Sequence, residues 1–330
     1  MSSEIYVVTV TYGKRAHLLT RVLDAAKGQG AVEAIVIDNG STDPVRDILA
    51  ERYGDWAFVH SMGGNKGTAL AFKTGIQTAL ARGAEFLLLL DDDNILQSGC
   101  IDKLCKVFAL RSPEFGLQGL MLSAWREGRQ GWLQPGTMRW REYRSSFISF
   151  RIQNLPAKLM SLLHTNQPDP NLAGVEITAP FAVYGGLFFN RGLIDFIGLP
   201  REEFFLYGDD TEFSYRFSRA GGKIILTSDA RIKDIAFSWN EENQSWAGPI
   251  TWVLAKPSSP IFYQFRNAVY FAYHVNERNI LTLFINTIIY MSIIIITCII
   301  TRRWRSLRVL CVAFRNGVAG RLGASPRFPL

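Results

Sequence analysis

Three consecutive aspartates, residues 91–93, directly follow an apolar run at residues 86–90. Carboxylate oxygens are the ligands that Mg²⁺ and Mn²⁺ prefer, and such a cation can neutralise the charge of a departing diphosphate. In an extended segment Asp91 and Asp93 point the same way, so we expect this pair to serve a ribose and a metal, with Asp92 beside them at the ligand. Taken alone, the three residues are also compatible with a solvated acidic turn.

A second acidic group, Asp209, Asp210 and Glu212, opens a segment with helical spacing. A direct displacement that inverts an anomeric carbon needs a carboxylate to take the proton of the attacking hydroxyl. Helical geometry puts Asp209 and Glu212 near one face and Asp210 elsewhere. Adjacent carboxylates raise one another's pKa, which suits a base. The structural alternative is a set of acids that favour the positive end of the helix dipole.

Further polar loops follow other apolar runs, at residues 11–15, 38–43 and 63–67. A carboxylate just past a strand, such as Asp38, can accept hydrogen bonds from a base or ribose, although it can also cap a helix. Loop glycines allow the backbone to approach a ligand closely. The candidates for ligand contact, besides Asp91 and Asp92, are Thr11, Tyr12, Arg15, Asp38, Asn39, Asn65, Lys66 and Gly186.

The elements that must position these residues alternate along the chain. Apolar β-rich runs lie at 5–10, 34–37, 56–60 and 86–90, and helical spacing lies at 15–27, after Pro44 and at 68–82. This alternation predicts an α/β fold with a mostly parallel sheet and flanking helices. Since ligands bind beyond the carboxyl ends of such strands, the clusters at 11–15, 38–43 and 91–94 should share one rim.

The periodicity also suggests how the chain is divided. Residues 1–235 are expected to form the ligand-binding and catalytic domain. Residues 125–174, where periodicity is poor, are expected to be an acceptor-side insert in it. Residues 236–330 are expected to form a helical region that associates with a membrane.

The C-terminal region combines an apolar segment with a basic tail. Residues 280–300 carry no charge, and as a helix they would extend about 30 Å, enough to cross a hydrocarbon core. Residues 301–330 hold seven arginines and no acid, which equals the net charge of +7 of the whole chain. This concentration argues against a nucleic-acid binder and favours an anionic membrane surface. A spanning helix and a monotopic helix in one leaflet both remain open.

Several segments together carry a family resemblance: VTYGKR at 10–15, IDNGSTD at 37–43, residues 65–75, LDDD at 90–93, FLYGDDTEFSYR at 205–216, YQFRN at 263–267 and residues 317–323. They resemble the family-2 inverting glycosyltransferases of GT-A (Rossmann-like) fold. The bacterial rhamnosyl- and galactofuranosyltransferases are the branch that the chain is most similar to.

The resemblance implies that Asp38 contacts the nucleobase of a nucleotide-sugar donor. It also implies that Asp91 and Asp93 serve the ribose, the diphosphate and a Mn²⁺ or Mg²⁺ ion. Many members place a histidine ligand after the strand that follows the acidic helix, but residues 231–234 contain none. Either Asp234 substitutes for it, or the site has one protein ligand fewer.

The resemblance further implies that Asp210 is the base, with Asp209 and Glu212 as supporting acids. The donor would be UDP-galactofuranose or dTDP-rhamnose. The acceptor would be a lipid-linked saccharide at the cytoplasmic face of the bacterial inner membrane, in the assembly of O-antigen, capsule or cell-wall glycan.

Two other classes are weighed against this hypothesis. A nucleotidyltransferase would need a longer and more glycine-rich basic loop than residues 11–15 after its first strand. A membrane-anchored sugar-nucleotide-binding protein without activity would not need the intact acidic clusters at 91–93 and 209–212. Donor hydrolysis would distinguish such a binding protein from an enzyme.

Overall fold

The computed structural model describes residues 4–126, 145–154, 174–236, 248–276 and 279–330. The chain forms two compact units. Unit 1 comprises Met1–Met138, Asp169–Glu202 and Asp209–Ala236, and unit 2 comprises Arg139–Pro168, Glu203–Gly208 and Phe237–Leu330. Most of the expected insert at 125–174 lies outside the described residues. The division at residues 235 and 236 stays a prediction.

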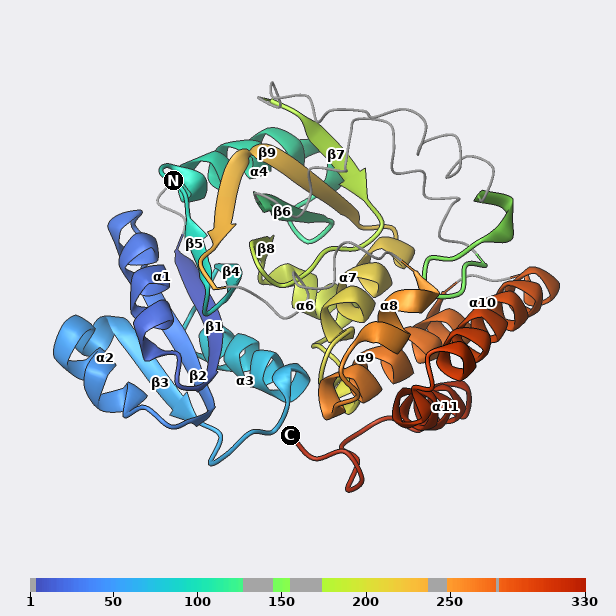
Figure 1. Ribbon diagram of the computed structural model, residues 1–330. Coiled ribbons are helices and arrows are strands. Elements are labelled where there is room, and N and C mark those ends of the chain that lie inside the picture. The colour runs from blue at the N-terminus through green and yellow to red at the C-terminus, as the bar shows by residue number, and fades with distance from the viewer. Residues whose placement is uncertain (1–3, 127–144, 155–173, 237–247, 277–278) are drawn as a thin grey trace. The chain divides into compact units, whose positions relative to one another are not determined.

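The first half of unit 1 alternates strands and helices, as predicted (Figure 1). Its elements are β1 (Ile5–Gly13), α1 (Ala16–Gly28), β2 (Glu33–Ser41), α2 (Val45–Tyr53), a 3-10 turn (Gly54–Trp56), β3 (Ala57–Ser61), α3 (Thr68–Ala81) and β4 (Phe86–Asp91). The strands pair in parallel in the order β3-β2-β1-β4. The carboxyl ends of these four strands therefore lie at one edge of the sheet.

The second half of unit 1 makes the sheet mixed. Its elements are β5 (Asn94–Leu96), α4 (Cys100–Phe115), β6 (Leu120–Arg126), β7 (Glu176–Ala179), β8 (Leu187–Asn190), α6 (Gly192–Ile197), α7 (Asp209–Arg219) and β9 (Lys223–Asp234). Strand β8 lies antiparallel between β4 and β6, and β6 pairs in parallel with β9. Strands β5 and β7 pair antiparallel with β9. The sheet thus extends its order to β3-β2-β1-β4-β8-β6-β9-β5.

Apolar side chains cover both faces of this sheet. Val8 and Leu89 pack in the cluster that includes α3, whereas their neighbours Val7 and Leu88 pack in the cluster that includes α4. Alternation along each strand produces this division. Helix α3 approaches the sheet at Gly75, where a Cβ atom would lie 2.5 Å from Val8 Cγ1. Gly75 lowers the helix propensity of α3, but it also allows this helix to pack closely against the sheet.

Unit 2 is helical among its described residues. It contains α8 (Pro249–Leu254), α9 (Ser259–Tyr270), a π-helix (Phe271–Val275), α10 (Ile280–Ile300) and α11 (Trp304–Val318). Short 3-10 turns lie at Ile152–Asn154 and, at the boundary of the units, at Glu202–Phe204. An aromatic core forms around the fully buried Phe147, Phe262 and Tyr263. Among the described helices, α10 alone is long and apolar enough to cross a membrane, as judged by length and composition.

Candidate functional site

The three aspartates predicted at the sheet edge lie where β4 ends. Asp91 is the last residue of β4, and Asp92 and Asp93 form a tight turn before β5. The segment is therefore a turn and not the extended chain that was expected. As a result, Asp91 and Asp93 contact different partners.

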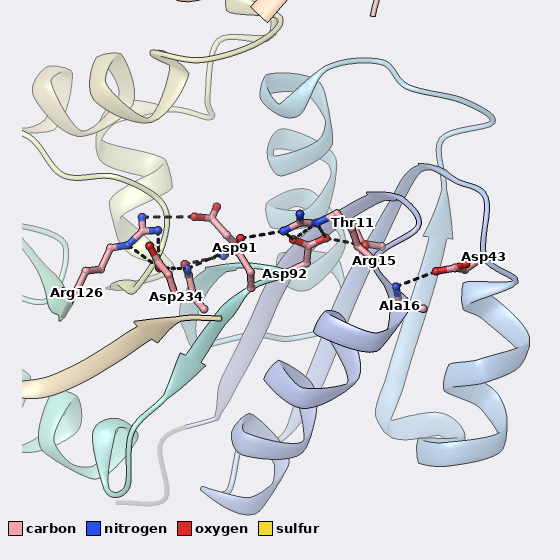
Figure 2. A network of polar contacts seen from close by, with 10 residues as sticks. Thr11, Arg15, Ala16, Asp43, Asp91, Asp92, Arg126 and Asp234 are labelled. Carbon is pink, nitrogen blue, oxygen red and sulfur yellow. Dashed lines mark hydrogen bonds and ion pairs between the residues drawn. The ribbon is translucent and has the colours of Figure 1, made fainter. Parts of the chain in front are cut away.

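Asp92 binds Thr11 at the end of β1 and Arg15 just after this strand (Figure 2), and Asp93 also binds Arg15. Asp92 is 3% exposed and accepts hydrogen bonds from Thr11 Oγ1 at 2.8 Å and from Arg15 Nη2 at 2.7 Å. Arg15 Nη2 also donates to Asp93 Oδ2 at 2.9 Å. Three residues predicted to contact the nucleotide, Thr11, Arg15 and Asp92, thus hold two loops of the rim together. Tyr12 is 47% exposed, with the Arg15 guanidinium 5.3 Å from its ring centre.

Asp91 and Asp234 lie on either side of a buried arginine, Arg126, the last residue of β6 (Figure 2). Arg126 Nη2 donates to Asp234 Oδ1 at 2.8 Å, and Arg126 Nη1 lies 3.5 Å from Asp91 Oδ2. The side chains of Arg126 and Asp234 are 9% and 7% exposed. Strand β9 extends beyond its apolar part to Asp234, and this length brings the carboxylate to the site.

Asn94 connects the parts of this network. Its Oδ1 accepts the backbone N–H of Asp91 at 3.2 Å, and its Nδ2 donates to Asp234 Oδ1 at 2.8 Å and to Asp93 Oδ1 at 3.2 Å. Asn94 is fully buried, so these hydrogen bonds satisfy both ends of its amide. One amide therefore connects two carboxylates, those of Asp93 and Asp234, with the backbone of Asp91.

The charges of this cluster do not balance. Four carboxylates meet two guanidinium groups: Asp91, Asp92, Asp93 and Asp234 against Arg15 and Arg126. The loss of surrounding water raises the pKa of Asp91 to about 6, while Arg126 opposes the rise and Asp93 adds to it. Among these six described groups the carboxylates exceed the guanidinium groups by two, and this excess equals the charge of one divalent cation.

A hard divalent cation suits the chemistry of this donor set, since oxygen ligands surround the excess negative charge. Among the described residues, however, no group of three or more His, Cys, Asp or Glu side chains is already arranged to hold a metal ion. The arginines explain this, because Arg15 engages Asp93 and Arg126 engages Asp234. Asp91 and Asp93 stay the ligands predicted from the sequence, and Asp234 stays the candidate for a further ligand.

Two adjacent glycines border this cluster in different ways. A Cβ atom at Gly185 would lie 2.3 Å from Asn94 Oδ1 and 3.0 Å from both Arg126 Nη1 and Asp91 Oδ2. Gly186, the predicted contact residue, has φ of +85°, and its N–H donates to the Leu89 carbonyl at 2.9 Å. The backbone of Gly185 therefore lies against the charged network, while Gly186 connects β4 to β6.

The loops after β2 and β3 are joined by their asparagines. Asn39 Oδ1 accepts the Lys66 N–H at 2.8 Å, and Asn39 Nδ2 donates to Asn65 Oδ1 at 3.3 Å. Asp38 Oδ1 accepts the Ser41 N–H at 2.8 Å, which shapes the turn after β2. The predicted residues Asp38, Asn39, Asn65 and Lys66 are thus brought together at the edge where the parallel strands end.

The second acidic group begins α7. Asp209 is 3% exposed, whereas Asp210 is half-buried and its Oδ1 accepts the Thr211 N–H at 2.6 Å. Burial raises the pKa of Asp209 well above its usual value, and the charge of Asp210 adds to the rise. Burial also raises the pKa of Asp210, but hydrogen bonds from Thr211 oppose it. Asp209 therefore retains its proton more readily, and Asp210 is the better candidate for the ionised member of the pair.

Glu212 has a different environment. Its carboxylate accepts hydrogen bonds from Arg216 one helical turn later, at 3.0 and 3.2 Å. Arg216 also donates to the carbonyls of Ile197 and Leu199. Glu212 therefore takes part in fixing α7 to the segment before it.

One residue of the network, Arg126, was missed in the sequence, while Asn94 was predicted only as part of the rim segment 91–94 and Gly185 only as a backbone neighbour of Gly186. Asn94 directly follows the aspartates, and Arg126 ends an apolar run at residues 120–125. A charged residue at the end of a buried run could have indicated a position on the same rim. The antiparallel strand β8, which places Gly185 there, has no such signal.

The comparisons with known proteins agree with the fold. Residues 6–151 match the model of the family described as Glycosyl transferase family 2. The dTDP-rhamnosyl transferase RfbF of Shigella flexneri is 34% identical over 106 residues, which cover 32% of this chain and 34% of that protein. The galactofuranosyltransferase GlfT1 of Mycolicibacterium smegmatis is 24% identical over 221 residues, which cover 66% of this chain and 67% of that protein. The match thus spans about a third of the first relative's length.

Among solved structures, the chain is similar to a crystal structure of GalNAc-T7 with UDP, GalNAc and Mn²⁺. The TM-score is 0.55 at 15% identity, covering 81% of this chain and 47% of that one. This likeness shows the fold, which is that of the GT-A transferases.

Proposed function

Because the chain belongs to glycosyltransferase family 2, we propose that it transfers a sugar from a nucleoside-diphosphate donor with inversion of the anomeric carbon. One observation carries this proposal. Unit 1 carries two groups of buried or half-buried carboxylates, one with Asp91 at the end of β4 and one with Asp209 and Asp210 at the start of α7. The reaction needs one carboxylate that takes the proton of the attacking hydroxyl, and a second that serves the leaving diphosphate on the other side of the anomeric carbon.

Asp210 is the base in this proposal. It takes the proton of the acceptor hydroxyl as that oxygen bonds to the anomeric carbon, and the bond from this carbon to the diphosphate oxygen breaks. The electron pair of the broken bond leaves with the nucleoside diphosphate. Asp209, which holds a proton more strongly, is the neutral neighbour that supports the base.

Asp91 and Asp93 would hold a Mn²⁺ or Mg²⁺ ion. When bound, such an ion neutralises negative charge on the leaving diphosphate. The excess of carboxylates over guanidinium groups among the described residues of the cluster supports this part of the proposal, as does the Mn²⁺ named in the GalNAc-T7 structure. Asp38, Asn39, Asn65 and Lys66 at the neighbouring strand ends would bind the rest of the nucleotide.

The names of the two relatives support dTDP-rhamnose or UDP-galactofuranose as the donor. The proposed acceptor is a lipid-linked saccharide in the assembly of a bacterial surface polysaccharide. The test is a panel of nucleotide sugars with Mn²⁺, first by thermal shift and then by release of nucleoside diphosphate. A donor that binds the folded protein raises its melting temperature. If no donor in the panel is either bound or cleaved, the proposal is wrong.

We also propose that α10 lies in the plane of the membrane. One stripe of this helix is buried inside unit 2 from Leu283 to Cys298. Asn286 within it donates to the Ser145 carbonyl at 2.9 Å and accepts the Ile152 N–H at 3.0 Å. The irregular backbone at Ser145 and Ile152 thus lies against α10. If α10 crossed the membrane alone, the polar groups of this backbone would be placed in hydrocarbon, which is unfavourable.

The opposite side of α10 is apolar and exposed, with Phe284 at 57% and Ile296 at 55%. The seven arginines of residues 301–330 are all exposed. An apolar side next to a basic segment fits insertion into one leaflet of anionic phospholipid, at the cytoplasmic face of the inner membrane.

Vesicle flotation tests this location. Each arginine near an anionic surface contributes about 1 kcal/mol, so Arg305→Gln with Arg308→Gln should weaken binding to phosphatidylglycerol vesicles roughly 30-fold. The matched control is Arg21→Gln with Arg191→Gln, two exposed arginines of unit 1. Equal binding by both double variants would contradict the proposal.

The exposed Cys311 distinguishes the two membrane arrangements. A thiol reagent that cannot cross membranes should leave it unlabelled when added outside spheroplasts that express the protein, and Cys311→Ser gives the background. Labelling of Cys311 from outside would show that α10 spans the membrane.

A further inference from the structure

Arg126 occupies a position between two carboxylates that come from different strands. Its guanidinium lies 3.5 Å from Asp91 Oδ2, at the end of β4, and 2.8 Å from Asp234 Oδ1, at the end of β9 (Figure 2). Asp234 Oδ1 accepts from both Arg126 Nε and Nη2, and from Asn94 Nδ2. A carboxylate oxygen with three donors is already committed, so a metal ion has to compete for it.

The positive charge between Asp91 and Asp234 is therefore supplied by a side chain of the protein, the guanidinium of Arg126. Arg126 is 9% exposed, and a buried arginine retains its positive charge, which the neighbouring Asp91 and Asp234 stabilise further by raising its pKa. A second cation beside it would feel repulsion in a region of low dielectric constant. The same guanidinium is also well shaped for a phosphate, with which it can form two parallel hydrogen bonds.

We propose that Arg126 is a resident cation that competes with a divalent ion for Asp91 and Asp234, so that the donor-free protein binds the ion weakly. A nucleoside diphosphate relieves this competition because its phosphate oxygens give the guanidinium another partner. The ion and the nucleotide then bind cooperatively, each strengthening the other to the same extent. This inference rests on the proposed function only for the identity of the ion and the nucleotide.

Binding of Mn²⁺ alone to the purified, donor-free full chain tests the competition, with free Mn²⁺ followed by electron paramagnetic resonance. Arg126→Gln removes the charge and keeps a hydrogen-bonding side chain. It should bind Mn²⁺ about tenfold or more tightly than the wild type, since a like charge at this range is removed. The matched control is Arg52→Gln on α2, which breaks the exposed pair with Asp24 on α1 and should leave Mn²⁺ binding unchanged.

A second variant guards against misfolding. Arg126→Lys keeps one charge but cannot bridge both carboxylates with a planar group. Its Mn²⁺ affinity should fall between those of the wild type and Arg126→Gln. If thermal melting shows that Arg126→Gln is unfolded, Arg126→Lys decides alone, and an affinity equal to or weaker than that of the wild type overturns the proposal.

Addition of UDP or dTDP tests the cooperativity. Either nucleotide should tighten Mn²⁺ binding by a larger factor in the wild type than in Arg126→Gln, where the competitor is already absent. If the nucleotide increased the Mn²⁺ affinity of both proteins by the same factor, Arg126 would have only a structural role, connecting the ends of β4 and β9. These measurements need no sugar transfer, so a chain without transferase activity would refute the proposed function and leave this inference standing.

Discussion

Two buried arginines, one in each unit, show how differently the chain uses the same side chain. In unit 1, Arg126 pairs with the carboxylates of Asp91 and Asp234, and these charges raise its pKa. In unit 2, Arg266 is 1% exposed and donates to the carbonyls of Gly323 at 2.6 Å and Phe204 at 3.0 Å. Burial lowers the pKa of Arg266 to about 10, well above neutral pH, so this guanidinium also stays charged.

The difference lies in the acceptors. Carbonyl groups carry no net charge that another cation could claim, and the ring of Tyr263, 4.9 Å from the Arg266 guanidinium, adds a further neutral partner. Arg266 therefore serves as a fixed connection between segments of unit 2. Arg126 lies among carboxylates that a metal ion can also use, which makes its contacts exchangeable. We expect changes in the Arg266 network of unit 2 to affect stability, and changes in the carboxylate network of unit 1 to affect activity.

The largest expected effect is on catalysis in unit 1. Asp210→Asn should lower kcat by about 10²–10⁴-fold, because the acceptor hydroxyl loses its base. Its melting temperature should not fall, since the variant removes a half-buried carboxylate whose ionisation opposes folding. Steady-state kinetics and thermal melting check this, with the exposed Asp195→Asn on α6 as the control. Wild-type turnover by Asp210→Asn would remove Asp210 from the mechanism.

The next effect concerns the stability of unit 2. Arg266→Met should lower the free energy of unfolding by about 3 kcal/mol, because the buried carbonyls of Gly323 and Phe204 and the Asn267 amide oxygen lose a donor. Urea denaturation followed by circular dichroism measures it. A loss of less than about 1 kcal/mol would mean that the neutral network is replaceable, and the contrast between the two arginines would disappear.

A smaller effect tests what holds the sheet of unit 1 together. Gly75→Ala should cost about 1–3 kcal/mol because its Cβ atom would overlap Val8 and crowd Ile37. Gly28→Ala in α1 is the control, because a Cβ atom there meets nothing within 4 Å. Equal unfolding midpoints for the two variants would show that α3 can shift, and that close packing is not what supports the charged rim.

The smallest effect is a pH dependence in unit 1. The raised pKa of Asp91 means that the folded protein keeps a proton that the unfolded chain has lost. Without metal, this group should therefore make stability fall as pH rises from about 4 to about 6. Asp91→Asn should make the slope less negative in chelator-treated protein. Asp24→Asn should leave the slope between pH 4 and pH 6 nearly unchanged, because Arg52 lowers the pKa of Asp24 and the contribution of that group to the slope lies below about pH 4. An unchanged slope in Asp91→Asn would contradict the expected cost of the charged network.

The sequence was informative wherever local periodicity determines position. Alternation of strands and helices over residues 5–90 correctly predicted that the polar loops after β1, β2 and β4 meet at one edge. The helix at 280–300 was also confirmed. Both follow from patterns of neighbouring residues, which a single sequence displays.

The rest depended on contacts between distant residues. Arg126 reaches Asp234 across 108 positions, and Asn94 reaches it across 140. Those pairings exist because β9 extends beyond its apolar part and because β8 enters the sheet antiparallel. Neither event leaves a repeating pattern, so the sequence predicted the aspartates but not the arginine that engages two of them.

Gly185 bears on how the chain tolerates genetic change. Any side chain at this position would press first on the ends of Asn94, Arg126 and Asp91, which can move aside without disturbing the backbone. A missense change there should consequently yield protein at normal abundance with a disordered charge cluster. Selection at this codon would therefore act through lost activity alone. A variant of this kind would serve as a folded but inactive control in cells.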